Sequence, residues 1–182
     1  MMRRLLSKLF HRARDRARDE EGTATIEFIF VVPILCTIFM ASVEAGLYMV
    51  RHVMMERGLD LVMRDVRLGR LGTFDHNELR RLICARTVVL VDCNSLLKVE
   101  MRPVSTATFA LPTMPATCID RGEETEALTT FTPGGAHEII IVRICVVQDP
   151  IFPSTGLGLR LRPASGGGYQ MVSNSIFVNE PR

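Results

Sequence analysis

The chain has 182 residues, of which 47% are hydrophobic and 23% are charged, and its formal net charge is +2. It is too apolar for a disordered or collagen-like protein, and its small total charge excludes a strongly basic nucleic-acid-binding protein. The charges are unevenly distributed along the chain. Residues 1–22 hold seven Lys or Arg against four Asp or Glu, a net charge of +3, whereas residues 23–50 hold only Glu27 and Glu44. A basic leader, residues 1–22, is therefore followed by an apolar segment.

The apolar segment is long enough to cross a membrane. Residues 28–50 read FIFVVPILCTIFMASVEAGLYMV. As a helix this run spans roughly 34 Å, more than the hydrocarbon core of a bilayer, which is about 30 Å thick. We therefore expect one transmembrane helix over residues 23–50. Within about 20 residues of the apolar run, seven Lys or Arg residues precede it and five follow it. This bias predicts a cytoplasmic N-terminus and a periplasmic C-terminal part.

Residues along this segment distinguish three ways of processing the N-terminus. A lipoprotein is disfavoured because Leu35, which is not a small residue, precedes Cys36. A secretory signal peptide remains an alternative, with cleavage after Val43-Glu44-Ala45. The third fate fits more residues: the charged leader ends at Gly22, and the fifth residue after it is Glu27, which resembles a type IV prepilin processing site.

Further residues make this pattern more specific, namely Glu27-Phe28, Pro33, Glu44-Ala45-Gly46 and the ending Phe177-Val178-Asn179-Glu180-Pro181. Together they resemble the TadE-like proteins of the tight-adherence (Flp, type IVc) pilus system. The resemblance implies a minor pseudopilin-like component of pilus assembly in the bacterial inner membrane, cleaved between Gly22 and Thr23 by a prepilin peptidase. It also implies other pseudopilins and the inner-membrane assembly platform as partners, and no catalytic site in the chain itself.

Glu27, with Phe28 beside it, is the candidate for setting the register of assembly. A carboxylate near the end of a membrane helix is costly unless it is paired, and cleavage after Gly22 creates an ammonium group at Thr23, four residues away. In a bundle of such helices, this ammonium group and Glu27 of a neighbouring subunit would neutralise each other and fix the axial register. The alternative is that Glu27 reaches the lipid headgroups.

Two further features of the apolar segment concern its packing. Pro33 removes one backbone hydrogen bond, which predicts either a static kink or a turn that bends during extraction from the bilayer. Ser42 and Gly46 are small residues four apart, a spacing that allows another helix to approach closely. Glu44 lies beside them, where it either meets a partner group or reaches water.

The remaining chain is expected to form a stalk, residues 51–72, and a periplasmic head, residues 73–182. The stalk continues the helix, because apolar residues recur with helical spacing at Met55, Leu59, Val62 and Val66. In the head, the residue pattern predicts a helix over 76–84 and strands over 96–102, 137–148 and 169–178. The expected fold class is α+β and type IV pilin-like, with an antiparallel sheet packed on the long N-terminal helix.

Four of the five cysteines lie in the head: Cys84, Cys93, Cys118 and Cys145. An even number of cysteines in an oxidising compartment predicts two disulfides, and we expect Cys84 to pair across the short loop with Cys93, leaving Cys118 for Cys145. A zinc site is disfavoured because the sequence brings no two of these cysteines close enough together.

Nothing in the sequence indicates an enzyme. It contains no P-loop, nucleophile elbow or dinucleotide-binding fingerprint, and its four histidines lie at no metal-ligand spacing. We therefore expect no catalysis, cofactor, metal, nucleic acid or small-molecule substrate, and membrane lipid and pilus proteins as the partners. The alternative function is an unprocessed, membrane-anchored periplasmic adaptor or envelope protein that keeps its leader.

Overall fold

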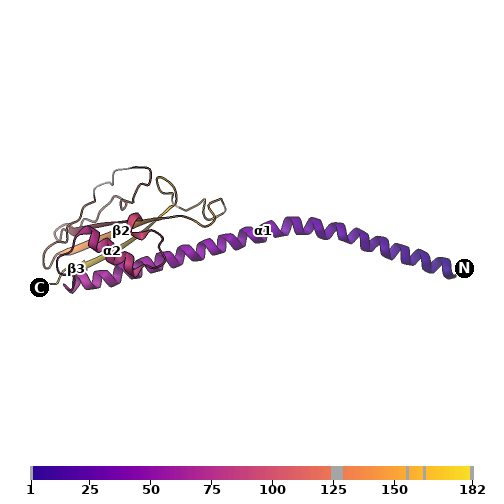
Figure 1. Cartoon of the computed structure of the whole chain (residues 1–182), viewed down its shortest axis with the longest axis horizontal. Coiled ribbons are helices and arrows are strands. Elements are labelled where there is room, and N and C mark those ends of the chain that lie inside the picture. Colours follow the sequence, from indigo (N-terminus) through magenta and orange to yellow (C-terminus); the bar gives the residue numbers. More distant parts are fainter. Residues whose placement is uncertain (1, 124–128, 155, 162, 181–182) are drawn as a thin grey trace.

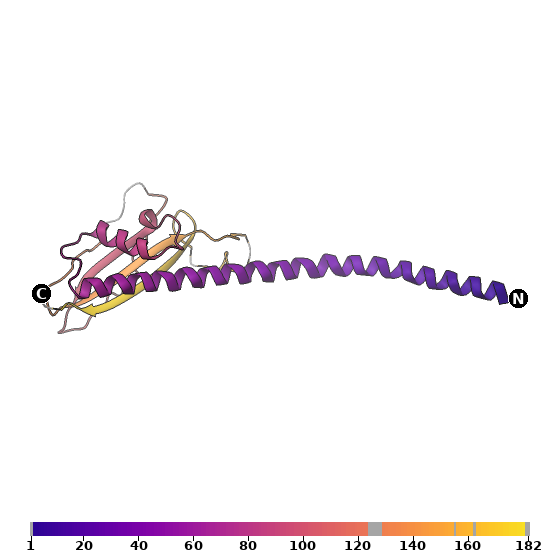
Figure 2. The same ribbon diagram turned by 60° about the horizontal axis from the view of Figure 1, so that its bottom comes forward.

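The computed structural model describes residues 2–123, 129–154, 156–161 and 163–180, and for residues 2–22 it describes the backbone alone. One long helix, α1 (Met2–Arg67), carries a small head at its C-terminal end (Figures 1 and 2). In chain order, the head contains α2 (His76–Arg86), α3 (Cys93–Leu96), β1 (Leu97–Val104), β2 (Ile139–Gln148) and β3 (Tyr169–Val178). The expected fold class, a long N-terminal apolar helix followed by a small pilin-like α+β head, is confirmed.

Helix α1 runs without interruption through Pro33 and curves gently along its length (Figure 2). It ends at Arg67, where the Gly69 N–H donates to the Val66 carbonyl at 2.9 Å. Gly69 and Gly72 then adopt φ angles of 65° and 66°, which only glycine adopts readily. The two glycines therefore turn the chain out of the helix and back towards α2.

The three strands form one antiparallel sheet with β2 in the centre. Nine of the ten positions of β2 are buried, which accounts for its continuous run of Ile and Val. The strand begins at Ile139, two residues later than expected, because His137 has a φ of 65° and donates its N–H to the Asn179 carbonyl at 2.9 Å. The β3 strand has the bounds expected from the sequence.

The hydrophobic core lies between the sheet and the C-terminal part of α1, with α2 packed beside both. The expected stripe of α1 is buried, and it joins side chains of the other elements in one cluster that includes Met55, Leu59, Val62, Val66, Leu79, Ile83, Val99, Met101, Ile140, Val142 and Ile144. Gly58 allows the close approach of α2, because a Cβ atom at this position would overlap the Thr87 methyl group. This part of α1 is therefore an integral element of the head.

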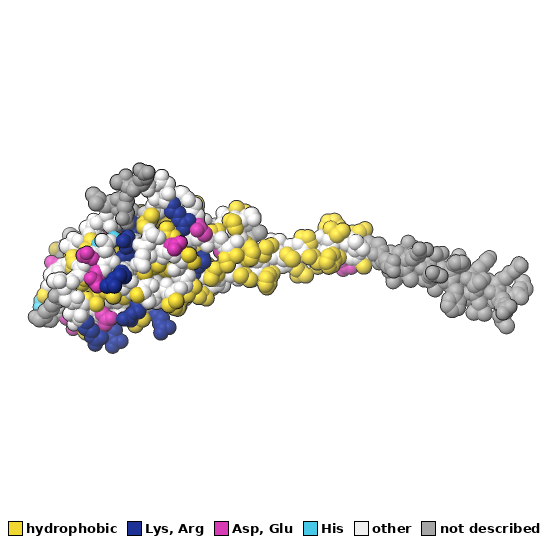
Figure 3. Space-filling view, viewed as in Figure 1, with side chains coloured by type: hydrophobic (Ala, Val, Ile, Leu, Met, Phe, Trp, Pro, Cys, Tyr) yellow, Lys and Arg dark blue, Asp and Glu magenta, His cyan; other side chains and the backbone are white. Residues whose placement is uncertain are grey.

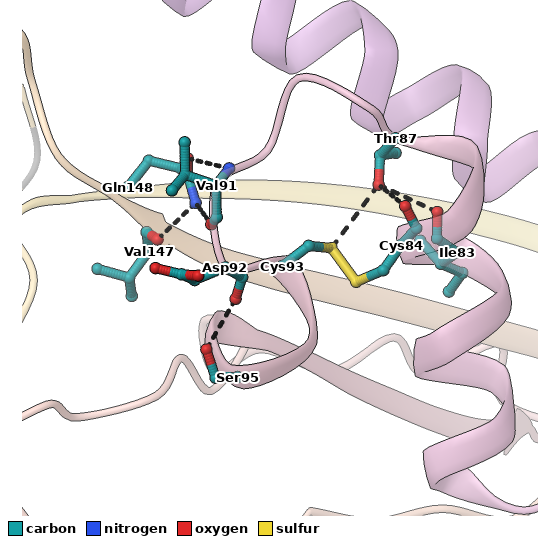
Figure 4. The surroundings of a disulfide bond; sticks show 9 residues. All are labelled: Ile83, Cys84, Thr87, Val91, Asp92, Cys93, Ser95, Val147 and Gln148. Atoms are coloured by element: carbon teal, nitrogen blue, oxygen red, sulfur yellow. Dashed lines mark hydrogen bonds between the residues drawn. A yellow bond between two sulfur atoms is a disulfide. The ribbon is translucent and has the colours of Figure 1, made fainter.

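Two disulfides fasten the head, and both are the pairs expected from the sequence. Cys84–Cys93 joins α2 to the start of α3, and Cys118–Cys145 fastens the long segment after β1 to the central strand. Between Cys84 and Cys93, residues 88–92 form turns. Gln148 holds these turns, because its Nε2 donates to the Val91 carbonyl at 2.8 Å and its Oε1 accepts from the Val91 N–H at 3.1 Å (Figure 4).

Candidate assembly site on the N-terminal helix

The N-terminal part of α1 projects away from the head. We call residues 23–40 the bare segment, because nearly all of its side chains are exposed. Phe28, Phe30 and Phe39 are 65–69% exposed, and Figure 3 shows hydrophobic side chains along the visible face of the helix in this segment. The most apolar 18-residue window of the helix Thr23–Arg67 has a mean hydropathy of 2.4, and none of that window is buried. By length and composition the helix is consistent with a membrane anchor.

The expected processing and register residues all lie on this projecting part of the helix. The backbone is helical on both sides of the Gly22–Thr23 bond. Side-chain surroundings are described from Thr23 onward. Glu27 is exposed, and the described side chains of its own chain supply it with no ion-pair partner. At Pro33 the helix persists, and the Thr37 hydroxyl donates to the Pro33 carbonyl at 2.7 Å. Glu27 and Phe28 are therefore exposed on the helix surface, away from the head.

Ser42 and Gly46 lie just beyond the bare segment. The Ser42 hydroxyl donates to the Ile38 carbonyl at 2.8 Å, within the helix, and both residues are exposed. A Cβ atom placed on Gly46 would meet nothing within 4 Å. These two positions therefore form a small, open strip on the helix surface.

Glu44 has the opposite surroundings. It is 1% exposed, and its Oε2 accepts hydrogen bonds from the backbone N–H groups of Ile151 at 2.9 Å and Phe152 at 3.0 Å. At about 100° per residue, Glu44 points away from the face that carries Ser42 and Gly46. The group that Glu44 meets is thus the loop after β2 of its own head.

Arg51, two helical turns further along the same face, makes a second polar contact with the head. It is 7% exposed, and its Nη1 donates to the Asp149 carbonyl at 3.0 Å and to the Tyr169 hydroxyl at 2.7 Å. Burial raises the pKa of Tyr169 above its ordinary value of 10.0, and the Arg51 cation offsets part of this effect. Arg121 holds the same loop from the other side through an ion pair with the Asp149 carboxylate at 2.6 Å.

Together, Glu44 and Arg51 fasten the head to the helix at the point where the bare segment ends. We call these two residues, with Asp149, Ile151, Phe152 and Tyr169, the latch. Burying a carboxylate or guanidinium group without hydrogen bonds destabilises the folded state. The burial of Glu44 and Arg51 therefore depends on the hydrogen bonds that they make with the loop and with Tyr169. The latch sets the position on α1, near Glu44, up to which the head extends towards the N-terminus.

Residues 22–60 match the family model of TadE-like proteins. This segment contains the bare segment, Glu27 and Glu44, the open strip at Ser42 and Gly46, and the Gly58 contact with α2. Over residues 22–60 the chain is therefore similar to TadE-like proteins. A search of the curated proteins and a search of the solved structures each found no significant match.

Similarity to the TadE-like family over this segment implies a role in assembly of the Tad pilus and suggests other components of that system as partners. TadE-like pilus proteins are structural proteins and not enzymes. In the described part of this chain, no three His, Cys, Asp or Glu side chains come together as a group able to hold a metal ion, and no catalytic site is shown.

Sequence reasoning missed Arg51, Asp149 and Tyr169. Glu44 and Arg51 are seven residues apart, which is a signal that they share one face of a helix. Their partners are 98 to 118 residues away in the sequence, within and beside a Pro- and Gly-rich loop. No local pattern in that loop indicates that its backbone N–H groups bind a carboxylate.

Proposed function

We propose that this TadE-like protein is a minor pseudopilin-like component of tight-adherence pilus assembly, cleaved after Gly22 by a prepilin peptidase and bundled through its N-terminal helix. The main support for the proposal is the bare segment, a long apolar helix surface that the head leaves uncovered. This segment lies within the residues that match the family model. So much exposed apolar surface requires lipid or other helices around it.

The proposed topology places the leader, residues 1–22, in the cytoplasm, the helix from residue 23 in the inner membrane and the head in the periplasm. The two disulfides support this orientation, because disulfides persist in the oxidising periplasm. Of the proposed transmembrane residues 23–50, the structure engages Glu44 with the head. The lipid-facing part of the span therefore ends close to residue 44, and the stalk and head together occupy the periplasm.

In the proposed bundle, Glu27 pairs with the ammonium group that cleavage creates at Thr23 of a neighbouring subunit. Four residues of helix separate the two groups by about 6 Å along the axis, so pairing between chains offsets the subunits by a defined step. The absence of an ion-pair partner among the described side chains leaves Glu27 available for this contact. Pro33, one to two turns further on, would ease bending as the helix leaves the bilayer.

We also propose that the open strip packs against another helix. Because Glu44 holds the head on one face, the face with Ser42 and Gly46 is available to another pseudopilin helix or to the inner-membrane assembly platform. Small residues at this spacing allow two helix backbones to approach closely. The latch therefore orients the head relative to the face that meets partners.

The intact mass of the membrane-embedded protein tests the proposed processing. The protein is purified from membranes of a host with prepilin peptidase and from a matched host that lacks it. We expect a chain that begins at Thr23 in the first host and the full leader in the second. A chain with its leader intact in both hosts would support the unprocessed adaptor, and a chain that begins at Gly46 would show that a signal peptidase had cut it.

A further inference from the structure

The loop that follows β2, residues 150–161, extends beside α1 towards the N-terminus (Figures 1 and 2). Its described residues are 150–154 and 156–161. Ile151 and Phe152 are tied to Glu44 by their backbone N–H groups, and a Cβ atom on Gly156 would lie 3.6 Å from the Ala41 Cβ. The loop thus lies against the helix at a level between residues 41 and 44.

That level is inside the span expected for the bilayer. If the hydrocarbon core begins at Phe28, Ala41 lies about 20 Å from its inner edge, roughly 10 Å short of the outer edge of a core about 30 Å thick. If the core begins at Thr23, Ala41 still lies roughly 3 Å inside the outer edge by the same arithmetic. Either placement brings the loop to the outer leaflet.

The residues of the loop suit this position. Ile151 is 52% exposed and Leu159 is 70% exposed, and the loop contains one charged residue, Arg160. In Figure 3, hydrophobic side chains continue from the helix onto the end of the head that faces the N-terminus. A long arginine side chain can keep its charge among the headgroups while the apolar residues enter the acyl region.

Backbone groups of the loop are also partly satisfied within the protein, as an interfacial position requires. The N–H groups of Ile151 and Phe152 bind Glu44, and those of Arg160 and Leu161 bind the Leu157 carbonyl at 2.8 and 3.1 Å. Unpaired backbone groups are not tolerated in the hydrocarbon core, but the interface accepts segments that bury apolar side chains about 5–10 Å deep. The loop in turn covers the Glu44 carboxylate, which would otherwise face lipid.

We infer that the 150–161 loop is a second membrane contact, which inserts Ile151 and Leu159 into the outer leaflet of the lipid bilayer beside the transmembrane helix. The inference rests on the proposed membrane topology. The head would then be held against the membrane at two points, and its tilt relative to the bilayer would be fixed by the latch.

Tryptophan fluorescence tests this contact directly, because the chain contains no Trp. The full chain is reconstituted in phosphatidylcholine vesicles with and without bromine atoms on the acyl chains, which quench nearby Trp emission. Two variants report on the loop, Ile151→Trp and, separately, Leu159→Trp. Phe39→Trp reports on the bare segment, and Val88→Trp reports on the head at a side chain that is 85% exposed. Val88 follows Thr87, which packs at Gly58, about 25 Å further along α1 than Ala41.

We expect brominated lipid to quench Phe39→Trp most, both loop variants by a smaller amount, and Val88→Trp not at all. Bromine near the headgroup end of the acyl chains should quench the loop variants more than bromine near the methyl end. Quenching of Phe39→Trp alone, with both loop variants as bright as Val88→Trp, would overturn the inference and leave the membrane anchor in place. If Phe39→Trp is not quenched either, the proposed topology and the inference both fail.

Discussion

The two parts of α1 share one secondary structure and have opposite surroundings. The bare segment exposes nearly all its side chains, whereas Met55 and Leu59 are completely buried in the head. The two carboxylates of the apolar run differ in the same way. Glu27 is exposed at its start, and Glu44 is 1% exposed and binds two backbone N–H groups. One continuous apolar run therefore contains a part that needs an external apolar environment and a part that the head already satisfies.

Removal of the Cys118–Cys145 disulfide should cause the largest loss of head stability. The chain-entropy model gives about 3.5 kcal/mol for its 27-residue loop and about 2.6 kcal/mol for the 9-residue loop of Cys84–Cys93. Urea unfolding of the two double Cys→Ala variants in detergent, followed by near-ultraviolet circular dichroism, measures both losses. A larger loss from the Cys84–Cys93 variant would contradict this order.

A pair of leucine substitutions tests the contrast within α1. Leu59→Ala removes a completely buried side chain from the core and should destabilise the head by about 3 kcal/mol. Leu35→Ala, in the bare segment at 58% exposure, should change head stability by less than about 0.5 kcal/mol. The same urea titration in detergent compares them. Equal losses would mean that the bare segment also packs on the head.

Glu44→Ala should destabilise the head by about 2 kcal/mol, because it leaves the Ile151 and Phe152 N–H groups without their acceptor. Glu44→Gln keeps a carbonyl oxygen at this position and should lose less. Thermal unfolding midpoints of both variants, measured beside Glu27→Ala, provide the comparison. We expect no shift for Glu27→Ala, and an unchanged midpoint for Glu44→Ala would show that the latch does not stabilise the head.

The smallest expected effect concerns Tyr169 at high pH. Burial raises its pKa in the folded protein above 10.0, so the unfolded chain releases this proton first as the pH rises. The contribution of Tyr169 to stability is therefore complete below pH 10.0 and is lost as the pH rises through the folded pKa. Thermal midpoints between pH 8 and 11 should fall more steeply for the wild type than for Tyr169→Phe. If the thermal midpoints of the wild type and of Tyr169→Phe fall equally with pH, Tyr169 does not contribute to this pH dependence.

The features that the sequence predicted well depend on local spacing. The helical stripe of Met55, Leu59, Val62 and Val66 identified the face of α1 that enters the core, and the alternation and β-branched content of the three strands identified the sheet. The roles of Glu27 and Pro33, inferred from their positions relative to Gly22, stay predictions. Each of these signals lies within a few turns of helix or one strand.

Local sequence patterns could not predict the latch, because it joins α1 to a loop about a hundred residues later through backbone N–H groups. Any residue except proline supplies such a group, so the loop carries no distinctive side chain at the contact. The apolar composition around Glu44 indicated membrane, while the structure places its carboxylate within the protein. The proposed limit of the lipid-facing segment, close to residue 44, therefore depends on tertiary structure.

We propose that Glu27, on the part of α1 that the head leaves uncovered, sets subunit register in the pilus assembly. Its most direct test is pilus formation by cells that carry Glu27→Gln, which keeps the size of the side chain and removes its charge. On this proposal we expect a chain still cleaved after Gly22, a head with an unchanged thermal midpoint, and no pilus. Wild-type numbers of pili from the Glu27→Gln chain would contradict it.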